Sequence, residues 1–346
     1  MKVLHVSDSF NAGVRHGIES LVSQNPQHEH FLLWASHSDS PAPTSQDLNS
    51  HFKSTWMWKG NLVKKYIQLL RLIPLLGIDG IHLHSSIAGA LGRLIPRKIS
   101  KMYSPHCFAF QRTDISKFLQ KTYLLAEYLL SKRKCALALN WPIEVQLAEK
   151  YFGRSEIVFI PIVDLGEIQR TTLRPNIDAF RIVTVGRIRP QKDPHFLSQA
   201  LKNRPGLRDK IIWIGSGDSD LSSMLENSNV KVIPWMRQDD IWNTETKFLA
   251  TCIPSSWESG PLTLFESLSA GYPVICRDIP ALNLYGFQTF HSPTDFAQGL
   301  ERILESEGFR SELFRSQVET IVEVFRIFNF NYAVADIYVA GFKVDA

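Results

Sequence analysis

Two glutamates frame a turn in the segment SSWESGPLTLFESLSAGYPVI, residues 255–275. Carboxylates are hydrogen-bond acceptors, so Glu258 and Glu266 suit a ligand that carries several hydroxyl groups. Eight residues of helix span about 12 Å at 1.5 Å per residue. The two side chains can therefore contact different parts of one extended ligand.

The elements around this turn favour an anion beside the glutamates. The apolar run 248–255 predicts a buried strand, and a helix is expected from Leu262 onward. Pro261 suits the first helical turn, where its missing N–H removes no hydrogen bond. The free N–H groups and the positive end of this helix predict a site for a diphosphate.

A second group of residues with matching chemistry lies upstream, in FRIVTVGRIRPQKDPHFL. Residues 180–185 predict a strand, and Gly186, Arg187 and Lys192 follow it before a helical pattern. Arginine can hold phosphate oxygens with its planar fork, and lysine adds a compact positive charge. Taken alone, this segment could equally be a solvated basic loop.

Together, VGRIRPQKD and ESGPLTLFESLSAGYPVI resemble the donor half of glycosyltransferase family four, retaining enzymes with the GT-B fold. Four further segments agree: KVLHVSDSFNAGVRHGIESL, IHLHSSIAGALGRL, MYSPHCFAFQR and ALALNWPIEVQLAEKYFG. The family often has Gly-Phe-Gly after the first glutamate, where this chain has Ser259, Gly260 and Pro261. It also often has a glycine pair where this chain has Ala12 and Gly13.

The resemblance implies a retaining hexosyltransferase that uses a nucleoside-diphosphate sugar and a hydroxyl of a glycan or lipid-linked acceptor in envelope polysaccharide synthesis. Arg187 and Lys192 would neutralise the leaving diphosphate, Glu258 would hold the sugar, and Glu266 the ribose. The other expected donor-binding residues are Gly186, Ser259, Gly260, Pro261 and Leu262. No enzyme nucleophile, metal or other cofactor is expected.

His106 and Gly13 are the candidates in the first half of the chain. Ser104-Pro105-His106 ends a predicted strand, and the carboxyl edge of a parallel sheet is where ligands bind. The family's comparable histidine approaches the sugar and the diphosphate, so the resemblance makes His106 a catalytic candidate, although a satisfied loop histidine is the alternative. Gly13 is expected in an acceptor-side loop, where it could instead simply make the turn.

The order of the elements predicts an α/β protein with two Rossmann-like, doubly wound domains facing a central cleft. The expected domains are residues 1–165 on the acceptor side and 175–330 on the donor side, joined by a linker at 165–178. The resemblance implies that a helix at about 331–346 packs back on the first domain. Strands are predicted at 2–7, 30–35, 79–84, 101–105, 136–140 and 157–161, then at 181–185, 211–214, 230–234, 248–253 and 273–276.

Two patterns that could hold a metal favour other interpretations. Asp218 and Asp220 follow a glycine turn at a predicted helix start, so helix capping is expected there. His82 and His84 alternate along a predicted strand and are expected to point to opposite faces, which would prevent a shared metal.

Charge is uneven along the chain, since residues 1–170 hold 20 Lys and Arg against 13 Asp and Glu, and the rest holds 18 against 21. The predicted helix NLVKKYIQLLRLIPLL carries Lys64, Gln68 and Arg71 on one face. An anionic membrane surface is a candidate partner, with an ordinary solvated helix as the alternative. A nucleic-acid partner is not expected. Further basic residues are Arg93, Arg97, Lys98, Lys101, Lys132, Arg133 and Lys134.

The four cysteines show no CxxC spacing, and no uncharged run of 18 residues occurs. We therefore expect a cytoplasmic protein, peripheral at the inner face of the plasma membrane. A non-hydrolysing nucleotide-sugar epimerase and a non-catalytic GT-B scaffold are the alternative functions. The base, the sugar and the acceptor stay open.

Overall fold

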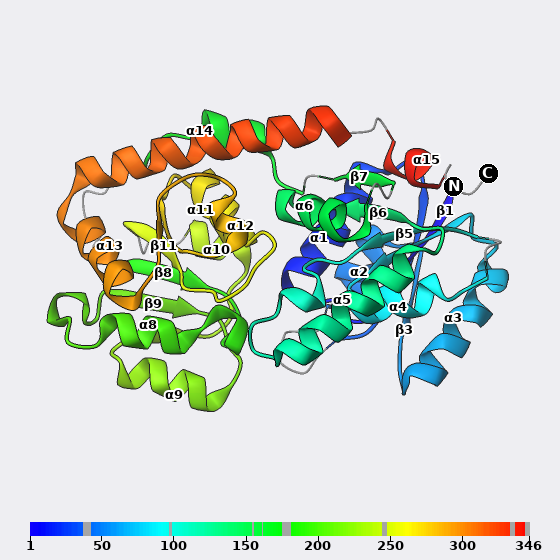
Figure 1. Cartoon of the computed structure of the whole chain (residues 1–346), viewed down its shortest axis with the longest axis horizontal. Helices are drawn as coiled ribbons and strands as arrows, with labels where there is room; N and C mark the ends of the chain where they lie inside the picture. Colours follow the sequence, from blue (N-terminus) through cyan, green and yellow to red (C-terminus); the bar gives the residue numbers. More distant parts are fainter. Residues whose placement is uncertain are drawn as a thin grey trace. The chain divides into compact units, whose positions relative to one another are not determined.

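The computed structural model describes residues 1–36, 43–96, 99–153, 156–160, 162–174, 181–243, 248–332 and 336–342 (Figure 1). The chain divides into two compact units. Unit 1 comprises Met1–Ile162 and Ile327–Ala346, and unit 2 comprises Val163–Arg326.

Unit 1 is built on a seven-stranded parallel sheet in the order β3-β2-β1-β4-β5-β6-β7. Its strands are β1 (Lys2–Ser7), β2 (Glu29–Trp34), β3 (Ser54–Met57), β4 (Gly80–His84), β5 (Ser100–Ser104), β6 (Ala136–Leu139) and β7 (Ile157–Phe159). Its helices are α1 (Ala12–Gln24), α2 (Ser45–His51), α3 (Leu62–Leu76), α4 (Ser86–Arg93), η1 (Ala109–Gln111), α5 (Lys117–Ser131), α6 (Pro142–Phe152) and α15 (Ile337–Phe342). Strand β3 was not predicted, because this short edge strand is partly exposed and lacks an apolar run.

Unit 2 repeats the arrangement with six parallel strands in the order β10-β9-β8-β11-β12-β13. The strands are β8 (Ile182–Val185), β9 (Ile211–Ile214), β10 (Lys231–Ile233), β11 (Ala250–Ile253), β12 (Val274–Arg277) and β13 (Thr289–Phe290). The helices are α7 (Leu165–Arg170), η2 (Pro190–Lys192), α8 (Pro194–Leu201), η3 (Pro205–Leu207), α9 (Ser219–Asn227), α10 (Gln238–Trp242), α11 (Leu262–Ser269), α12 (Pro280–Asn283), α13 (Pro293–Glu305) and α14 (Glu307–Tyr332), whose residues from Ile327 onward belong to unit 1. The expected linker begins with helix α7, and residues 175–178 lie outside the described residues.

Strand order reverses once in each sheet, between β1 and β4 in unit 1 and between β8 and β11 in unit 2. In a parallel sheet the carboxyl ends of all strands meet at one edge, and ligands bind where the order reverses. The prediction of two doubly wound α/β sheets is confirmed. The loops after β1, β4, β8 and β11 are therefore the first places to look for a site.

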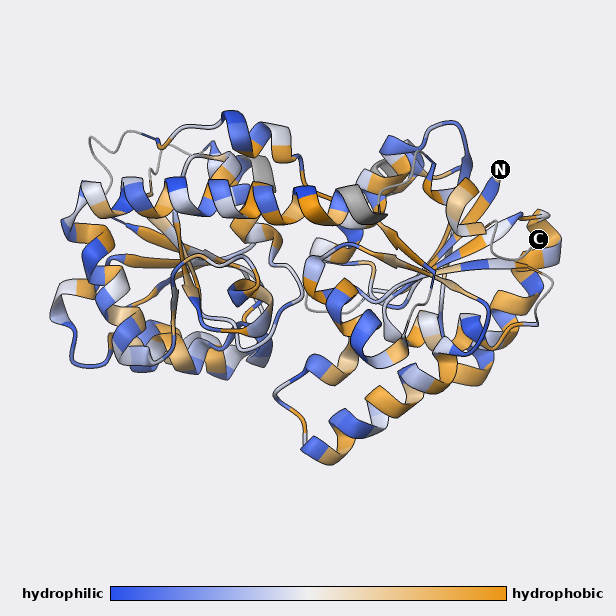
Figure 2. Ribbon diagram, turned by 45° about the horizontal axis from the view of Figure 1, so that its top comes forward, coloured by the Kyte–Doolittle hydropathy of each residue, from blue (hydrophilic) through white to orange (hydrophobic). Residues whose placement is uncertain are grey.

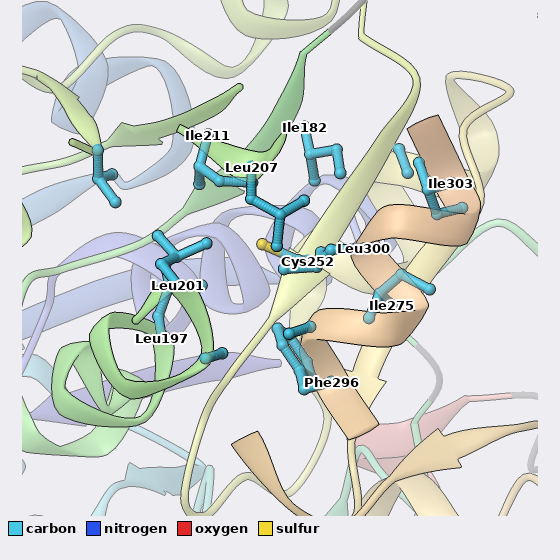
Figure 3. Packing of buried hydrophobic residues seen from close by; sticks show 14 of the residues in the cluster. Ile182, Leu197, Leu201, Leu207, Ile211, Cys252, Ile275, Phe296, Leu300 and Ile303 are labelled. Atoms are coloured by element: carbon cyan, nitrogen blue, oxygen red, sulfur yellow. The ribbon is translucent and has the colours of Figure 1, made fainter. Parts of the chain in front are cut away.

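The strands of both sheets are largely apolar, and most of their length has the hydrophobic colour in Figure 2. In unit 2, residues such as Ile182, Leu197 and Cys252 pack into one buried cluster between the sheet and helices α8 and α13 (Figure 3). In unit 1, Tyr338 and Phe342 of α15 pack with Val3, Met102 and other sheet residues. The last helix thus contributes side chains to the core of unit 1.

Some of the basic residues named above do not lie on the surface. Arg93 is 2% exposed, and its guanidinium lies 2.8 Å from the buried carboxylate of Glu127. The Tyr103 hydroxyl donates to the same carboxylate at 3.0 Å. Lys101 is also buried, in β5, whereas Arg97 and Lys98 lie outside the described residues. Among the described helices, none is long and apolar enough to span a membrane.

Candidate active site

The two glutamates lie on the strand–turn–helix formed by β11 and α11. Strand β11 is fully buried, and Glu258 sits in the loop between the two elements. Pro261 is the N-cap of α11 and not its first helical residue, and no side chain caps this end. Glu266 lies one turn inside the helix and is partly buried. The turn Ser259–Pro261 therefore leads directly into the N-terminus of α11, where the N-cap residue offers no capping side chain to the backbone donors.

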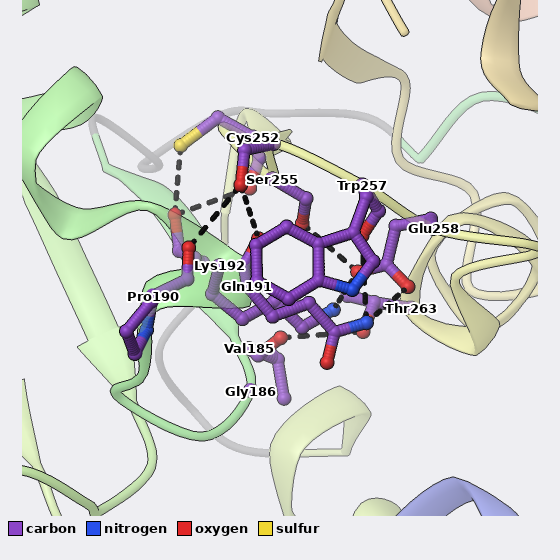
Figure 4. Close-up of polar contacts among 12 residues, drawn as sticks. Val185, Gly186, Pro190, Gln191, Lys192, Cys252, Ser255, Trp257, Glu258 and Thr263 are labelled. Carbon is purple, nitrogen blue, oxygen red and sulfur yellow. Dashed lines mark hydrogen bonds and ion pairs between the residues drawn. The ribbon is translucent and has the colours of Figure 1, made fainter. Parts of the chain in front are cut away.

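Glu258 is 8% exposed, and hydrogen bonds engage both of its oxygens (Figure 4). Its Oε1 accepts from Lys192 Nζ at 2.7 Å and from Ser255 Oγ at 2.9 Å. Its Oε2 accepts from Gln191 Nε2 at 3.2 Å. Because a buried carboxylate is costly without a partner, this pairing ties the loop after β11 to the loop after β8.

Gly186 provides the room for Lys192. A Cβ at Gly186 would lie 2.9 Å from Lys192 Cε, and the backbone has φ +151°. The Trp213 indole donates to the Gly186 carbonyl at 2.8 Å and is fully buried. Gly215 approaches the same carbonyl so closely that its own Cβ would lie 2.1 Å from the oxygen. Gly186 therefore shapes the path of the lysine side chain.

Arg187 directly follows Gly186 and is partly buried at the carboxyl end of β8. The first turn of α11 is attached at the same place, because Thr263 Oγ1 donates to the Val185 carbonyl at 3.3 Å. Unit 2 thus brings Gly186, Lys192 and Glu258 into contact, with Arg187 on the same loop as the lysine and the α11 N-terminus at the end of β8.

Burial raises the pKa of Glu266 to about 7, although Trp242 and the Lys192 charge act in the opposite direction. A hydroxyl donor that reached Glu266 would favour the ionised carboxylate and lower this pKa.

Sequence reasoning missed Gln191, Ser255 and Thr263, which hold the predicted residues in place. These side chains are polar and lie within a few positions of the predicted ones, but nothing in their spacing shows which loop they would join. Asp218 accepts hydrogen bonds from the backbone N–H groups of Asp220 and Leu221 at 2.9 and 3.0 Å, so the expected helix cap is confirmed.

In unit 1, His106 lies in the loop after β5 in an unusual backbone conformation. His106 and Cys107 have φ values of +50° and +96°. The buried carboxylate of Glu144 accepts from the Cys107 N–H at 2.8 Å and from the Asn140 N–H at 3.1 Å. Positive φ at two successive non-glycine residues is strained, and the hydrogen bond to this carboxylate helps to hold the loop in that conformation.

Gly13 is in the first turn of α1, not in the preceding loop as predicted. It is exposed, and Gly17 lies one turn further along the helix. A Cβ on Gly17 would lie 3.8 Å from His106 Cε1. Residues four apart share a helix face, so Gly13 and Gly17 belong to the face of α1 near His106.

The prediction that His82 and His84 point to opposite faces is wrong. Residues i and i+2 of a strand share a face, and the two rings have centroids 4.0 Å apart. With His5 they form the one group of described residues whose nitrogens, all within 4.8 Å of one another, could hold a metal ion. Three imidazoles are a donor set that suits zinc. The geometric argument against a shared metal at His82 and His84 therefore does not hold.

Comparison with known proteins identifies relatives of this chain. Residues 167–316 match the family model described as Glycosyl transferases group 1. The chain is 25% identical over 305 residues to an uncharacterized 41.2 kDa protein of the cps region of Klebsiella pneumoniae, covering 82% of each. It is 27% identical over 247 residues to the UDP-Gal:alpha-D-GlcNAc-diphosphoundecaprenol alpha-1,3-galactosyltransferase of Escherichia coli, covering 64% of this chain and 63% of that protein.

Among solved structures, Anabaena HepE in complex with UDP and glucose has a TM-score of 0.73 to this chain. The match covers 99% of this chain and 98% of HepE at 13% identity. Identity this low shows the fold alone, and it confirms the predicted GT-B fold.

We predict that Gly186→Ala destabilises unit 2 by about 1–3 kcal/mol, because a methyl group would enter a strained backbone position and press on Lys192. Urea unfolding of the full chain would measure the change. Gly206→Ala is the matched control, since a Cβ there meets no atom within 4 Å. Equal stability of the two variants, with the Lys192–Glu258 distance unchanged in a crystal structure, would contradict the role given to Gly186.

Proposed function

Since this chain belongs to the group 1 glycosyl transferases, we propose that it transfers a hexosyl unit from a UDP-sugar to a hydroxyl of a lipid-linked glycan in envelope polysaccharide synthesis. The observation that carries the proposal is the joining of Lys192 and Glu258 at the carboxyl ends of β8 and β11. It provides cationic donors and a carboxylate within one small region, beside a helix N-terminus. The donor and acceptor follow the name of the Escherichia coli relative and the UDP bound by HepE.

The diphosphate would bind at Arg187, Lys192 and the N-terminus of α11. The Lys192 ammonium has three N–H donors, and Glu258 engages one of them. The others can meet phosphate oxygens as negative charge grows on the leaving group. Glu258, held by Ser255 and Gln191, would accept from hydroxyl groups of the sugar.

The reaction would proceed with retention at the anomeric carbon. The bond from C1 to the diphosphate oxygen breaks, and the acceptor oxygen bonds to C1 on the same face. The acceptor's proton passes to the departing phosphate, so the protein supplies position and charge and needs no nucleophile. No metal is assigned a role in this proposal.

The decisive experiment is product analysis with a panel of UDP-hexoses, with and without polyprenyl-diphosphate-linked sugar. We expect a new glycosidic product only when both substrates are present, and a rate about 100-fold lower for Glu258→Gln. Ser256→Ala is the control, because the Ser256 hydroxyl donates to the backbone carbonyls of Pro190 and Gln191 and, among the described residues, to no side chain. Conversion of the sugar nucleotide without an acceptor would instead show an epimerase.

UDP affinity would test the role of Glu266. Its pKa of about 7 means that half of the carboxyl groups are ionised near neutral pH. Because a ribose hydroxyl donates to the ionised form, we expect UDP to bind more tightly as pH rises from 6 to 8. The slope should be smaller in Glu266→Gln, where ionisation of the terminal phosphate of UDP still contributes, and calorimetry would measure the difference. An unchanged slope in this variant would assign the pH dependence to another group.

A lipid-linked acceptor would bring the enzyme to a membrane, and unit 1 has a surface suited to it. Helices α3 and α5 both pack against α4. Helix α3 has no Asp or Glu, and the single carboxylate of α5, Glu127, is buried against Arg93. Apolar side chains exposed on these helices are Leu62, Val63, Ile67, Leu70, Leu75, Phe118, Leu125, Tyr128 and Leu129. Exposed cations are Lys64, Arg71, Lys117 and Lys121, followed by Lys132, Arg133 and Lys134 after α5.

We expect the full chain to sediment with vesicles of phosphatidylcholine and phosphatidylglycerol, and only weakly with phosphatidylcholine alone. Each basic residue near an anionic surface contributes about 1 kcal/mol, so Lys64→Glu/Arg71→Glu should weaken binding at least 10-fold. Phe118→Ser/Leu129→Ser should weaken it as well, because apolar burial is lost. Lys202→Glu in unit 2 is the control. If the chain sedimented with neither kind of vesicle, the proposed membrane-binding surface would be contradicted.

A further inference from the structure

Four buried or partly buried histidines of unit 1 form a continuous chain of hydrogen bonds through their ring nitrogens. His106 Nε2 lies 3.0 Å from His84 Nδ1, and His84 Nε2 lies 3.0 Å from His5 Nδ1. His5 Nε2 lies 3.1 Å from His30 Nδ1. His30 Nε2 ends the chain, 2.9 Å from the backbone carbonyl of Asn25. The chain crosses β2, β1 and β4 and reaches the loop after β5.

The Asn25 carbonyl sets the direction of this chain, because a carbonyl oxygen can only accept. His30 must therefore carry its proton on Nε2, which leaves Nδ1 as an acceptor in the neutral ring. His5 must then donate from Nε2, and His84 and His106 follow by the same rule. Each of the four rings is the Nε2–H tautomer, and His106 is left with a bare lone pair on Nδ1.

The rule applies to neutral rings, the ordinary form of histidine at pH 7, and none of the four rings is hydrogen-bonded to a carboxylate of a described residue that would favour a charged ring. Burial lowers the pKa of all four, to about 4 for His106 and well below the ordinary value for His5 and His84. Neighbouring rings lower the pKa of His5 and His84 further. At pH 7 each ring therefore has one donor and one acceptor nitrogen.

The reverse direction is disfavoured by the same geometry. The Tyr338 hydroxyl lies 3.4 Å from His5 Nε2, further away than His30. If Tyr338 donated to this nitrogen, the lone pairs of His5 and His30 would face each other within 3.1 Å. A buried acceptor without a donor costs more than the long bond to Tyr338 returns.

We propose that His84, His5 and His30 are positioning residues that hold His106 as the neutral Nε2–H tautomer, so that its Nδ1 accepts a hydrogen bond from a substrate hydroxyl. The ligand class rests on the proposed glycosyl transfer. Among the residues that the structure describes, none is hydrogen-bonded to His106 Nδ1. His106 thus serves as an acceptor and not as a cation that neutralises the diphosphate.

His82 provides a matched comparison within the same strand. It is as buried as His84, and its ring lies beside that of His84. Its Nε2 is bonded to Ser104 Oγ at 2.9 Å, and Ser104 donates to the Ala138 carbonyl. His82 therefore lies outside the chain, although its loss would disturb the core to a similar extent.

The test is a long-range proton–nitrogen NMR correlation of the full chain labelled with ¹⁵N-histidine, at pH 7 and without substrate. His106→Gln assigns the resonance of interest by its absence. We expect the shift pattern of a neutral Nε2–H ring for His106. An Nδ1–H ring or a charged ring would overturn the proposal. So would one equivalent of copurified zinc at His5, His82 and His84, because the ion would replace the bond between His5 and His84.

His84→Phe should leave His106 with mixed tautomers, while His82→Phe should keep the wild-type pattern. With a UDP-sugar and acceptor, we expect about a 5-fold lower kcat/KM for His84→Phe than for His82→Phe, equivalent to one hydrogen bond. An unchanged tautomer in His84→Phe would overturn the positioning role. If His84→Phe does not fold, the wild-type spectrum still decides. The spectrum also stands if no sugar transfer is found, so the two proposals fail separately.

Discussion

A carboxylate that is almost completely removed from water has to find positive charge and hydrogen-bond donors, and Glu258 meets this requirement in unit 2. Lys192 provides the charge, and Ser255 and Gln191 provide two further donors. Because Lys192 and Gln191 follow β8 whereas Ser255 and Glu258 follow β11, the pairing fixes the relation between two loops that are more than 60 residues apart. Gly186 leaves room for the Lys192 side chain, and the Thr263 hydroxyl attaches the first turn of α11 to the end of β8.

The residues that carry this interaction could be found from the sequence, since Gly186, Lys192 and Glu258 belong to recognisable patterns beside apolar strands. Their partners could not, because Ser255 and Gln191 owe their roles to the side-by-side placement of β8 and β11. The short strands β3 and β13 also escaped prediction, since strands of four and two residues leave no periodic signal. For His82 and His84 the error was one of geometry: the two-residue period of a strand puts them on one face.

The two units use the point of strand reversal in different ways. In unit 2 the loops beyond β8 and β11 gather ionic groups at the carboxyl edge. In unit 1 the strands at the reversal, β1 and β4, contribute His5 and His84 from within the sheet, and only His106 lies beyond a strand end. The ionic groups of unit 2 are thus kept at the edge of its sheet, whereas His5 and His84 inside the sheet of unit 1 hydrogen-bond to each other, as burial requires.

Helix α5 is built inside out, with its carboxylate toward the core and large apolar side chains toward the surface. Turning the helix about its axis to hide Phe118 and Leu129 would carry Glu127 away from Arg93 and leave the Arg93 guanidinium unpaired in the interior, at a cost of about 3–5 kcal/mol. The ion pair therefore fixes the rotation of α5 about its own axis, even though the hydrophobic effect alone would favour burial of the opposite face. The buried Arg93–Glu127 pair thus keeps the apolar side chains of Phe118 and Leu129 on the surface of unit 1.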